Sequence, residues 1–181
     1  MRFEATVNIE APVEAVWQFI QNLPALQKCA GIDPERGQVR QEADGIWAEM
    51  TMPFAGMALR GTANLTWTRQ DPPSNASMLA RIWVRRLDMP DRLSPAQSMP
   101  DQSPAQSPAG SPPSGILVSV HNDFTLAAIE QEKTRLVWQG EVELPDALRS
   151  FPPAMLRAAV TQQSQSFFGC MKRTLEAAGS A

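Results

Sequence analysis

The sequence predicts an α+β domain in which a curved antiparallel sheet of seven strands packs against one long C-terminal helix. Three observations lead to this class. Apolar and polar residues alternate with a period of two in seven segments, as on strands with one buried face. Short turns join successive strands, which is typical of antiparallel pairing. The C-terminal segment carries apolar residues at helical spacing, so it can cover the apolar face of the sheet.

The elements follow in a simple order along the chain. Residues 1–10 form the first strand, because Phe3, Ala5 and Val7 alternate with polar residues. Pro12 then opens a helix, since proline is tolerated at the first helical position. Asn22 begins a second short helix that runs to about Cys29. Six strands and a helix follow, in segments 39–43, 46–52, 57–68, 76–87, 116–126, 136–142 and 147–178.

Three details of these elements are specific. Asp44-Gly45 is a strong hairpin signal between two of the strands. Pro152-Pro153 should break or kink the first turns of the last helix. The inward face of the strand at 76–87 stays open, because two alternate sets are equally apolar, namely Met78, Ala80, Ile82 and Val84, or Leu79, Trp83 and Leu87.

The segment from Asp88 to Ser114 has a different composition from the rest. It is rich in Ser and Gln and holds many of the chain's 16 prolines. Such a segment cannot bury enough apolar surface to offset the entropy of ordering it. We therefore expect one domain over 1–181, with 88–114 as a disordered loop inserted between two strands.

Charge and hydropathy exclude several classes of protein. The 181 residues carry 16 Lys+Arg against 19 Asp+Glu, a net charge of -3, so no basic footprint for nucleic acid is expected. Glu4 interrupts the alternating start, which is unlike a secretory signal, and no apolar run is long enough to cross a bilayer. We expect a cytoplasmic protein. Cys29 and Cys170 lack metal-ligand spacing and are expected to be free, partly buried thiols.

Groups able to do acid–base or nucleophilic chemistry are predicted to face outward. The only histidine, His121, shares its strand face with Asp123, opposite the apolar set. Glu49 alternates away from the apolar face and is expected to pair with Arg60 on the next strand. Glu141 and Glu143 also point outward, and neither a phosphate loop nor a zinc spacing is present. The polar residues that could reach the inner face are Gln41, Asn122, Arg86, Gln162 and Ser166. An inner face with so few titratable groups argues against an enzyme and for a binding protein.

The order of elements and several short motifs resemble the CoxG-like family, which is related to carbon monoxide dehydrogenase and lies within the SRPBCC or START-like (polyketide cyclase/dehydrase) superfamily. The motifs are Phe3-Glu-Ala-Thr-Val-Asn-Ile9, Ala11-Pro12, Val16-Trp17 and, before Leu175, Ser166-Phe167-Phe168. The resemblance spans the chain apart from 88–114, and residues 29–32 depart from a Pro-Gly common there. It implies a helix-grip fold, in which the sheet wraps the C-terminal helix around a deep apolar cavity. It also implies association with a molybdenum hydroxylase of the CO dehydrogenase type, in quinone delivery or membrane recruitment.

Within this fold, the apolar faces supply the residues expected to line the cavity. Methionine adapts to irregular apolar ligands, and small residues leave room for them. The predicted lining residues are Ala48, Met50, Met52, Leu59, Gly61, Ala63, Met78, Ala80, Ile82, Asn122, Phe124, Trp138, Gly140, Met155, Ala159 and Phe167. We expect no catalytic residue, metal or covalently attached cofactor, and a quinone or lipid as the bound ligand.

Three functions remain open from the sequence. The first is a carrier that binds a hydrophobic small molecule such as a quinone, lipid or polyketide, as an accessory protein of a molybdenum hydroxylase complex. The second is a polyketide cyclase or dehydratase that uses its few inner polar groups to orient the substrate. The third is an assembly or membrane-recruitment factor that acts through surface features such as Arg81, Arg85 and Arg86. Contact with a membrane surface would then be peripheral.

Overall fold

A computed structural model describes residues 1–32, 37–54, 57–86, 115–146 and 152–179, and only the backbone of 52–54, 57–58 and 86. Its elements are β1 (Arg2–Ile9), α1 (Val13–Gln21), α2 (Leu23–Cys29), β2 (Gln38–Glu42), β3 (Gly45–Phe54), β4 (Met57–Asp71), β5 (Asn75–Arg86), β6 (Ile116–Glu130), β7 (Lys133–Glu143) and α3 (Pro153–Gly179). The segment 88–114, predicted to be a disordered loop, lies outside the described residues, and the single domain stays a prediction.

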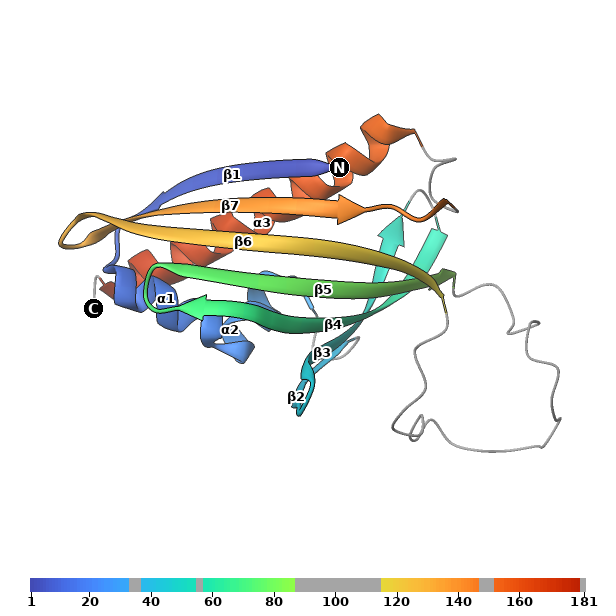
Figure 1. Cartoon of the computed structure of the whole chain (residues 1–181), viewed down its shortest axis with the longest axis horizontal. Helices are drawn as coiled ribbons and strands as arrows, with labels where there is room; N and C mark the ends of the chain where they lie inside the picture. The colour runs from blue at the N-terminus through green and yellow to red at the C-terminus, as the bar shows by residue number, and fades with distance from the viewer. Residues whose placement is uncertain (33–36, 55–56, 87–114, 147–151, 180–181) are drawn as a thin grey trace, which may run out of the picture.

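The strands form one sheet, in the order β1-β7-β6-β5-β4-β3-β2. Every neighbouring pair is antiparallel, and each strand from β2 to β7 pairs with the next one along the chain. The three helices lie on one side of this sheet, with α3 running along β1 and α1 and α2 beneath its C-terminal part (Figure 1). The predicted seven-stranded sheet with one long helix and two short ones is confirmed.

The larger hydrophobic core joins the β1–β7–β6 side of the sheet to α1 and α3. Ile9, Leu136 and Met171 are fully buried there, one from each of β1, β7 and α3. The two-residue period of the strands delivers the first two side chains, and the helical period of α3 delivers the third. This core fixes α3 against one half of the sheet.

A smaller core cluster lies over the other half of the sheet. Ile32, just after α2, packs on Ala48 of β3 and Ala63 of β4, and all three are buried. Ala48 and Ala63 are directly opposite each other in the β3–β4 register. Two separate clusters therefore cover the same sheet face.

The inward face of β5, which the sequence left open, is the Met78, Ala80, Ile82 set. Ala80 is buried and lies opposite Leu65 of β4, whereas Trp83 is on the outer face. There the Trp83 indole stacks on that of Trp47, with ring centroids 5.9 Å apart. Cross-strand aromatic contact on the solvent side explains why the alternate set is equally apolar.

Turns and helix ends agree with the sequence except at the start of α3. The Asn22 side chain caps α2 by accepting a hydrogen bond from the Ala25 amide at 3.1 Å. Gly45 has φ +135, and a Cβ there would overlap the Leu65 carbonyl oxygen, so the hairpin requires glycine. The last helix begins at Pro153, not at 147, because a proline fits the first helical turn but not the interior. Residues 147–151 lie outside the described part.

Candidate functional site

The predicted lining residues of the sheet gather on its helix-facing side. Across β3, β4 and β5, Ala48 lies opposite Ala63, and Ala63 lies opposite Ile82. The small residues are buried, namely Ala48, Gly61, Ala63 and Ala80. The large ones, Met50, Leu59, Met78 and Ile82, are only half-buried. The Met52 side chain lies outside the described part, as does that of Arg86.

The helix supplies the opposite wall. Met155 and Ala159 in the first half of α3 are also half-buried. Phe167, in contrast, packs against the larger core, where its ring contacts that of Phe168 at 5.4 Å between centroids. We call the half-buried residues Met50, Leu59, Met78, Ile82, Met155 and Ala159 the inner apolar surface. These side chains face α3 or the sheet and yet remain accessible, unlike the core beside them.

One polar pair lies next to this surface. Asn122 of β6 is 9% exposed and lies opposite Met78 in the register. Its Oδ1 accepts a hydrogen bond from the Trp138 Nε1 at 3.0 Å, and its Nδ2 donates to the Val120 carbonyl oxygen at 3.3 Å. An amide can make four hydrogen bonds, so Asn122 keeps one donor and one acceptor for a ligand.

Gly140 does not have the role that the sequence suggested. A Cβ at Gly140 would lie 2.5 Å from Cζ2 of the Trp138 ring, so the indole fills the space that glycine leaves. The same ring is buried and contacts Phe168 of α3, with centroids 5.6 Å apart. Phe124 likewise packs against the larger core and contacts Trp67 at 6.5 Å. Gly140 therefore serves the packing of Trp138 and leaves no room for a ligand.

Several other polar residues that could have reached the inner face do not. Gln41 is exposed, and its Nε2 donates to the carbonyl oxygens of Glu42 and Gly45 at 3.5 and 3.4 Å. Gln162 and Ser166 are exposed on α3. This prediction is wrong for all three, because the hairpin backbone and the rotation of α3 direct them outward.

The outward placement of the titratable groups agrees with the sequence. His121 is exposed, and Asp123 accepts a hydrogen bond from Ser77 Oγ at 2.5 Å. Arg60 donates to Glu49 across β3 and β4 at 2.8 Å. In the described part of the chain the buried polar residues are Asn64, Asn122 and Thr134, and none of these titrates.

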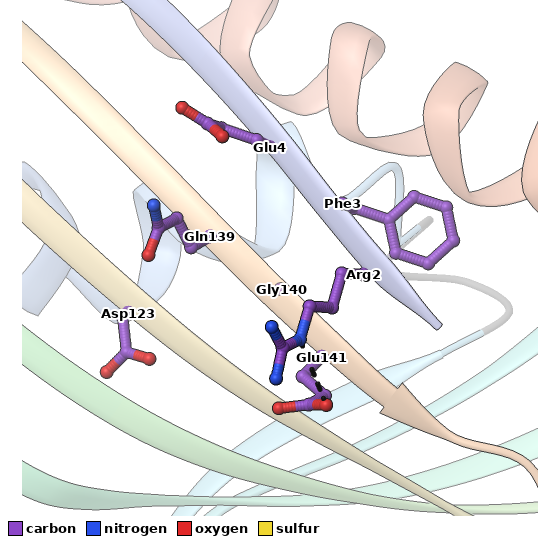
Figure 2. A pocket seen from close by; sticks show the side chains of 7 residues that line it. All are labelled: Arg2, Phe3, Glu4, Asp123, Gln139, Gly140 and Glu141. Carbon is purple, nitrogen blue, oxygen red and sulfur yellow. Dashed lines mark hydrogen bonds and ion pairs between the residues drawn. The ribbon is translucent and has the colours of Figure 1, made fainter.

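A pocket of about 530 Å³ lies elsewhere, at β1, β6 and β7 (Figure 2). Its polar lining consists of exposed side chains: Arg2, Glu4, Asp123, Gln139 and Glu141. Arg2 and Glu141 form an ion pair of 3.3 Å between them, and exposed pairs of this kind contribute little free energy. We therefore do not equate this pocket with the predicted ligand site.

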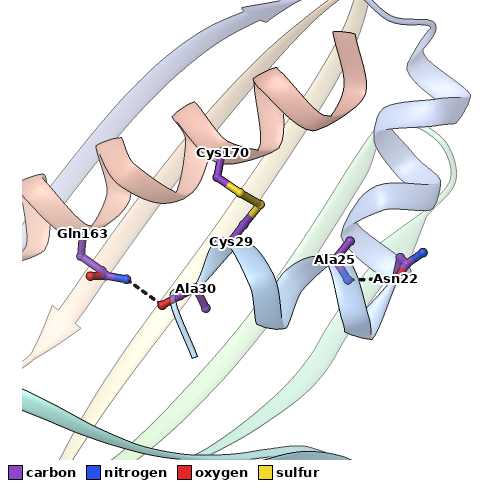
Figure 3. The surroundings of a disulfide bond; sticks show 6 residues. All are labelled: Asn22, Ala25, Cys29, Ala30, Gln163 and Cys170. Carbon is purple, nitrogen blue, oxygen red and sulfur yellow. Dashed lines mark hydrogen bonds between the residues drawn. A yellow bond between two sulfur atoms is a disulfide. The ribbon is translucent and has the colours of Figure 1, made fainter. Parts of the chain in front are cut away.

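The two cysteines form a disulfide, and the expectation of free thiols is wrong. Cys29 ends α2 and Cys170 lies in α3, with Cα atoms 5.3 Å apart and 141 residues between them in sequence (Figure 3). Sequence reasoning missed this pair because contact across such a separation depends on the docking of two helices. The available signals were the end position of Cys29 and the apolar helical row that includes Cys170.

Two searches of the described residues complete the site. No helix among them is long and apolar enough to span a membrane. No group of three or more His, Cys, Asp or Glu residues in the same ranges could hold a metal ion.

Comparison with known proteins places the architecture. Neither a family model nor a curated protein matches the sequence. A conserved protein from Geobacillus kaustophilus matches with a TM-score of 0.71 at 16% identity, over 97% of this chain and 95% of that one. A START superfamily protein from Mycobacterium smegmatis matches with a TM-score of 0.56 at 10% identity, over 97% of each chain. The chain has the START-like helix-grip fold.

A third similar structure is an enzyme. The Zhui aromatase/cyclase from Streptomyces sp. R1128 matches with a TM-score of 0.57 at 17% identity, over 97% of this chain and 93% of that one. Identity at this level supports a shared fold and leaves the chemistry to be argued from the residues. The helix-grip fold brings a sheet face and a helix together as the two walls of a hydrophobic binding region.

Proposed function

We propose that this protein binds a hydrophobic small molecule between the inner apolar surface of the sheet and the first half of α3. The observation that carries the proposal is the accessibility of large apolar side chains, such as Met50, Met78 and Met155, on two facing walls. A filled core would bury them, as it buries Leu136 and Met171. Binding sites of this kind are mostly apolar with a few polar anchors.

Asn122 is the polar anchor in this proposal. It lies beside Met78 and is held in place by Trp138 and by the Val120 carbonyl oxygen. Its remaining donor and acceptor suit a carbonyl or hydroxyl group on an otherwise apolar molecule. A quinone, a polyketide or the headgroup of a lipid carries such groups. Delivery of a quinone to a molybdenum hydroxylase complex of the CO dehydrogenase type is the specific role that we infer from the CoxG resemblance.

The ligand itself is best identified directly. Protein purified from its own host is extracted with organic solvent, and any molecule present near one per chain is identified by mass spectrometry. A quinone or lipid at that ratio supports the carrier function. An empty protein that shows no thermal shift with quinones, fatty acids or polyketides contradicts it.

A pair of helix variants tests the location. Ala159→Phe places a large ring on the inner side of α3 and should lower ligand affinity at least about tenfold, because it occupies the space of the ligand. Ala158→Phe, one residue away on the exposed side, is the matched control and should leave affinity unchanged. Titration calorimetry with the extracted ligand measures both variants. Equal affinity in the two would place the site elsewhere.

Polyketide cyclisation is the second candidate, and the likeness to the Zhui aromatase/cyclase favours it. Asn122 would then orient the substrate through its free donor and acceptor. Asn122→Leu should abolish turnover of a polyketide substrate if this candidate holds, whereas a carrier would only lose affinity. The surface-recruitment candidate has less support, since Arg81 and Arg85 are ordinary outer-face residues of β5.

A further inference from the structure

We propose that Cys29 and Cys170 are a site of thiol–disulfide exchange whose redox state controls access to the inner apolar surface. The substrate class is a dithiol reductant, or a disulfide oxidant in the reverse direction. The inference rests on the proposed ligand binding, because access matters only if a ligand enters there.

The disulfide is the strongest attachment between α2 and α3. Cys29 is the last residue of α2, and the bond joins it to the second half of α3 (Figure 3). One hydrogen bond supplements it, from Gln163 Nε2 of α3 to the Ala30 carbonyl oxygen at 3.3 Å. A single neutral hydrogen bond near the surface contributes little by comparison.

The three residues after Cys29 form a cap segment, Ala30–Ile32, over the sheet. The Ala30 amide donates to the Leu26 carbonyl oxygen at 2.8 Å and the Ile32 amide to that of Gln27 at 3.2 Å. Ile32 is 6% exposed and packs on Ala48 and Ala63, within the smaller core cluster. The position of Ile32 is thus set by the attachment of Cys29 to α3.

The attached side of α3 is also the side that carries the proposed lining. At 3.6 residues per turn, Met155, Ala159, Gln163 and Cys170 share one side of the helix. The first two belong to the inner apolar surface, and the last two make the contacts to α2. Movement of the cap segment away from α3 would therefore open the edge of this surface.

The exchange reaction is balanced by the partner dithiol. A thiolate of the reductant attacks one protein sulfur, the S–S bond breaks, and a mixed disulfide forms. The second thiol of the reductant then displaces the protein sulfur, which leaves two protein thiols and an oxidised reductant, with two electrons and two protons transferred. Cys170 is the more exposed of the two residues, so attack begins there. In a cytoplasmic protein, such as the sequence predicts, disulfides are usually transient and redox-sensing.

Hydrogen exchange of the full-length protein tests the release of the cap segment. Oxidised and fully reduced samples are compared, with free thiols counted by a thiol reagent. We expect the ratio of cap-segment exchange rates to those of β1 and β7 amides to rise at least about tenfold on reduction. The ratio removes any global loss of stability, because global unfolding speeds up both sets. A ratio that stays within about twofold overturns the proposal.

The double variant Cys29→Ser/Cys170→Ser is the matched control. It should show the high ratio with or without reductant, which separates loss of the bond from other effects of the reagent. If this variant does not fold, the reduced wild-type protein decides alone. Gln163→Ala should raise the ratio in the reduced protein and have little effect in the oxidised one.

A fluorescent fatty acid, cis-parinaric acid, tests access by stopped-flow association. We expect association and dissociation to be at least about fivefold faster in the reduced protein. Equal rates with an unchanged exchange ratio overturn the redox control and leave the proposed ligand binding intact. A raised ratio without probe binding to either form supports the release of the cap segment and counts against a fatty-acid ligand. An unchanged ratio overturns the proposal whatever the probe does.

Discussion

At the residue scale, Trp138 connects the main parts of the inner face. Its indole covers Gly140 of its own strand, its Nε1 donates to Asn122 of β6, and its ring contacts Phe168 of α3. The sequence placed Trp138, Gly140 and Asn122 on one face by alternation. It could not show that the indole fills the space above the glycine, because a side-chain rotamer is chosen by packing.

Trp138→Phe should lower the free energy of unfolding by about 1–3 kcal/mol. The change removes the Nε1 donor and leaves Asn122 Oδ1 without this partner in a buried position. Urea unfolding, followed by circular dichroism, measures the loss. Trp47→Phe is the control, since Trp47 donates to the exposed Asp44 at 2.9 Å and should cost at most about 1 kcal/mol. Equal losses in the two variants would contradict the role of the buried bond.

Gly140→Ala should also destabilise the protein, by about 1–3 kcal/mol, because the new methyl group meets the Trp138 ring. Gly169→Ala provides the comparison within α3. Its Cβ would meet only the end of the Arg173 side chain at 3.4 Å, and alanine is the better helix former. Thermal melts should therefore fall for the first variant and hold or rise for the second. A neutral Gly140→Ala would mean that Trp138 can move away at no cost.

At the scale of elements, three chain segments meet at the end of β1. Lys133, the first residue of β7, forms an ion pair of 2.9 Å with Glu10. The Glu10 amide donates to Glu176 of α3 at 3.1 Å, and Lys172 Nζ donates to the Asn8 carbonyl oxygen at 2.7 Å. These contacts hold the C-terminal part of α3 to the edge of the sheet. Their pairing could not be read from sequence, since it depends on how α3 lies across β1.

The Lys133–Glu10 pair should show itself in the pH dependence of stability. The hydrogen bond and charge of Glu10 raise the pKa of Lys133 above its ordinary value of 10.5. A raised folded-state pKa means that the stabilisation is fully present below the unfolded-state pKa and is lost as pH rises through the folded-state value. Lys133→Gln should therefore be less stable than wild type at pH 8, and the difference should shrink above pH 10.5.

Urea unfolding of both proteins at several pH values measures this difference. Arg135→Gln, an exposed change on the same strand, controls for loss of a positive charge. A difference between wild type and Lys133→Gln that stays constant from pH 8 to beyond 10.5 would contradict the role of the pair.

At the scale of the whole molecule, two core clusters cover one sheet face and the disulfide ties the helices above them together. The larger cluster joins β1, β6 and β7 to α1 and α3, and the smaller one joins Ile32 to β3 and β4. The inner apolar surface lies beside them on the same face. The accessible region is thus a consequence of one straight helix covering a wide sheet, because α3 runs along β1 at one edge (Figure 1).

Reduction of the disulfide should lower the free energy of unfolding by about 2–5 kcal/mol. The bond closes a loop with a sequence separation of 141 residues, so breaking it frees a large part of the unfolded chain. Guanidinium unfolding of fully oxidised and fully reduced protein gives the difference. Cys29→Ser/Cys170→Ser should unfold like the reduced protein and should not respond to reductant. Equal midpoints for oxidised and reduced wild type would show that the bond adds no stability.

The sequence by itself determined the class of fold, the order of its elements and the outward position of the titratable groups. Alternation and helical spacing are local properties, so Phe3 and Val7 on β1 or Leu175 on α3 could be placed without tertiary information. Only the tertiary structure decided the inward face of β5, the packing of Trp138 over Gly140, and the pairing of Cys29 with Cys170. These depend on contacts between segments far apart in the chain, and the free energy of such contacts is not encoded in the pattern of any one segment.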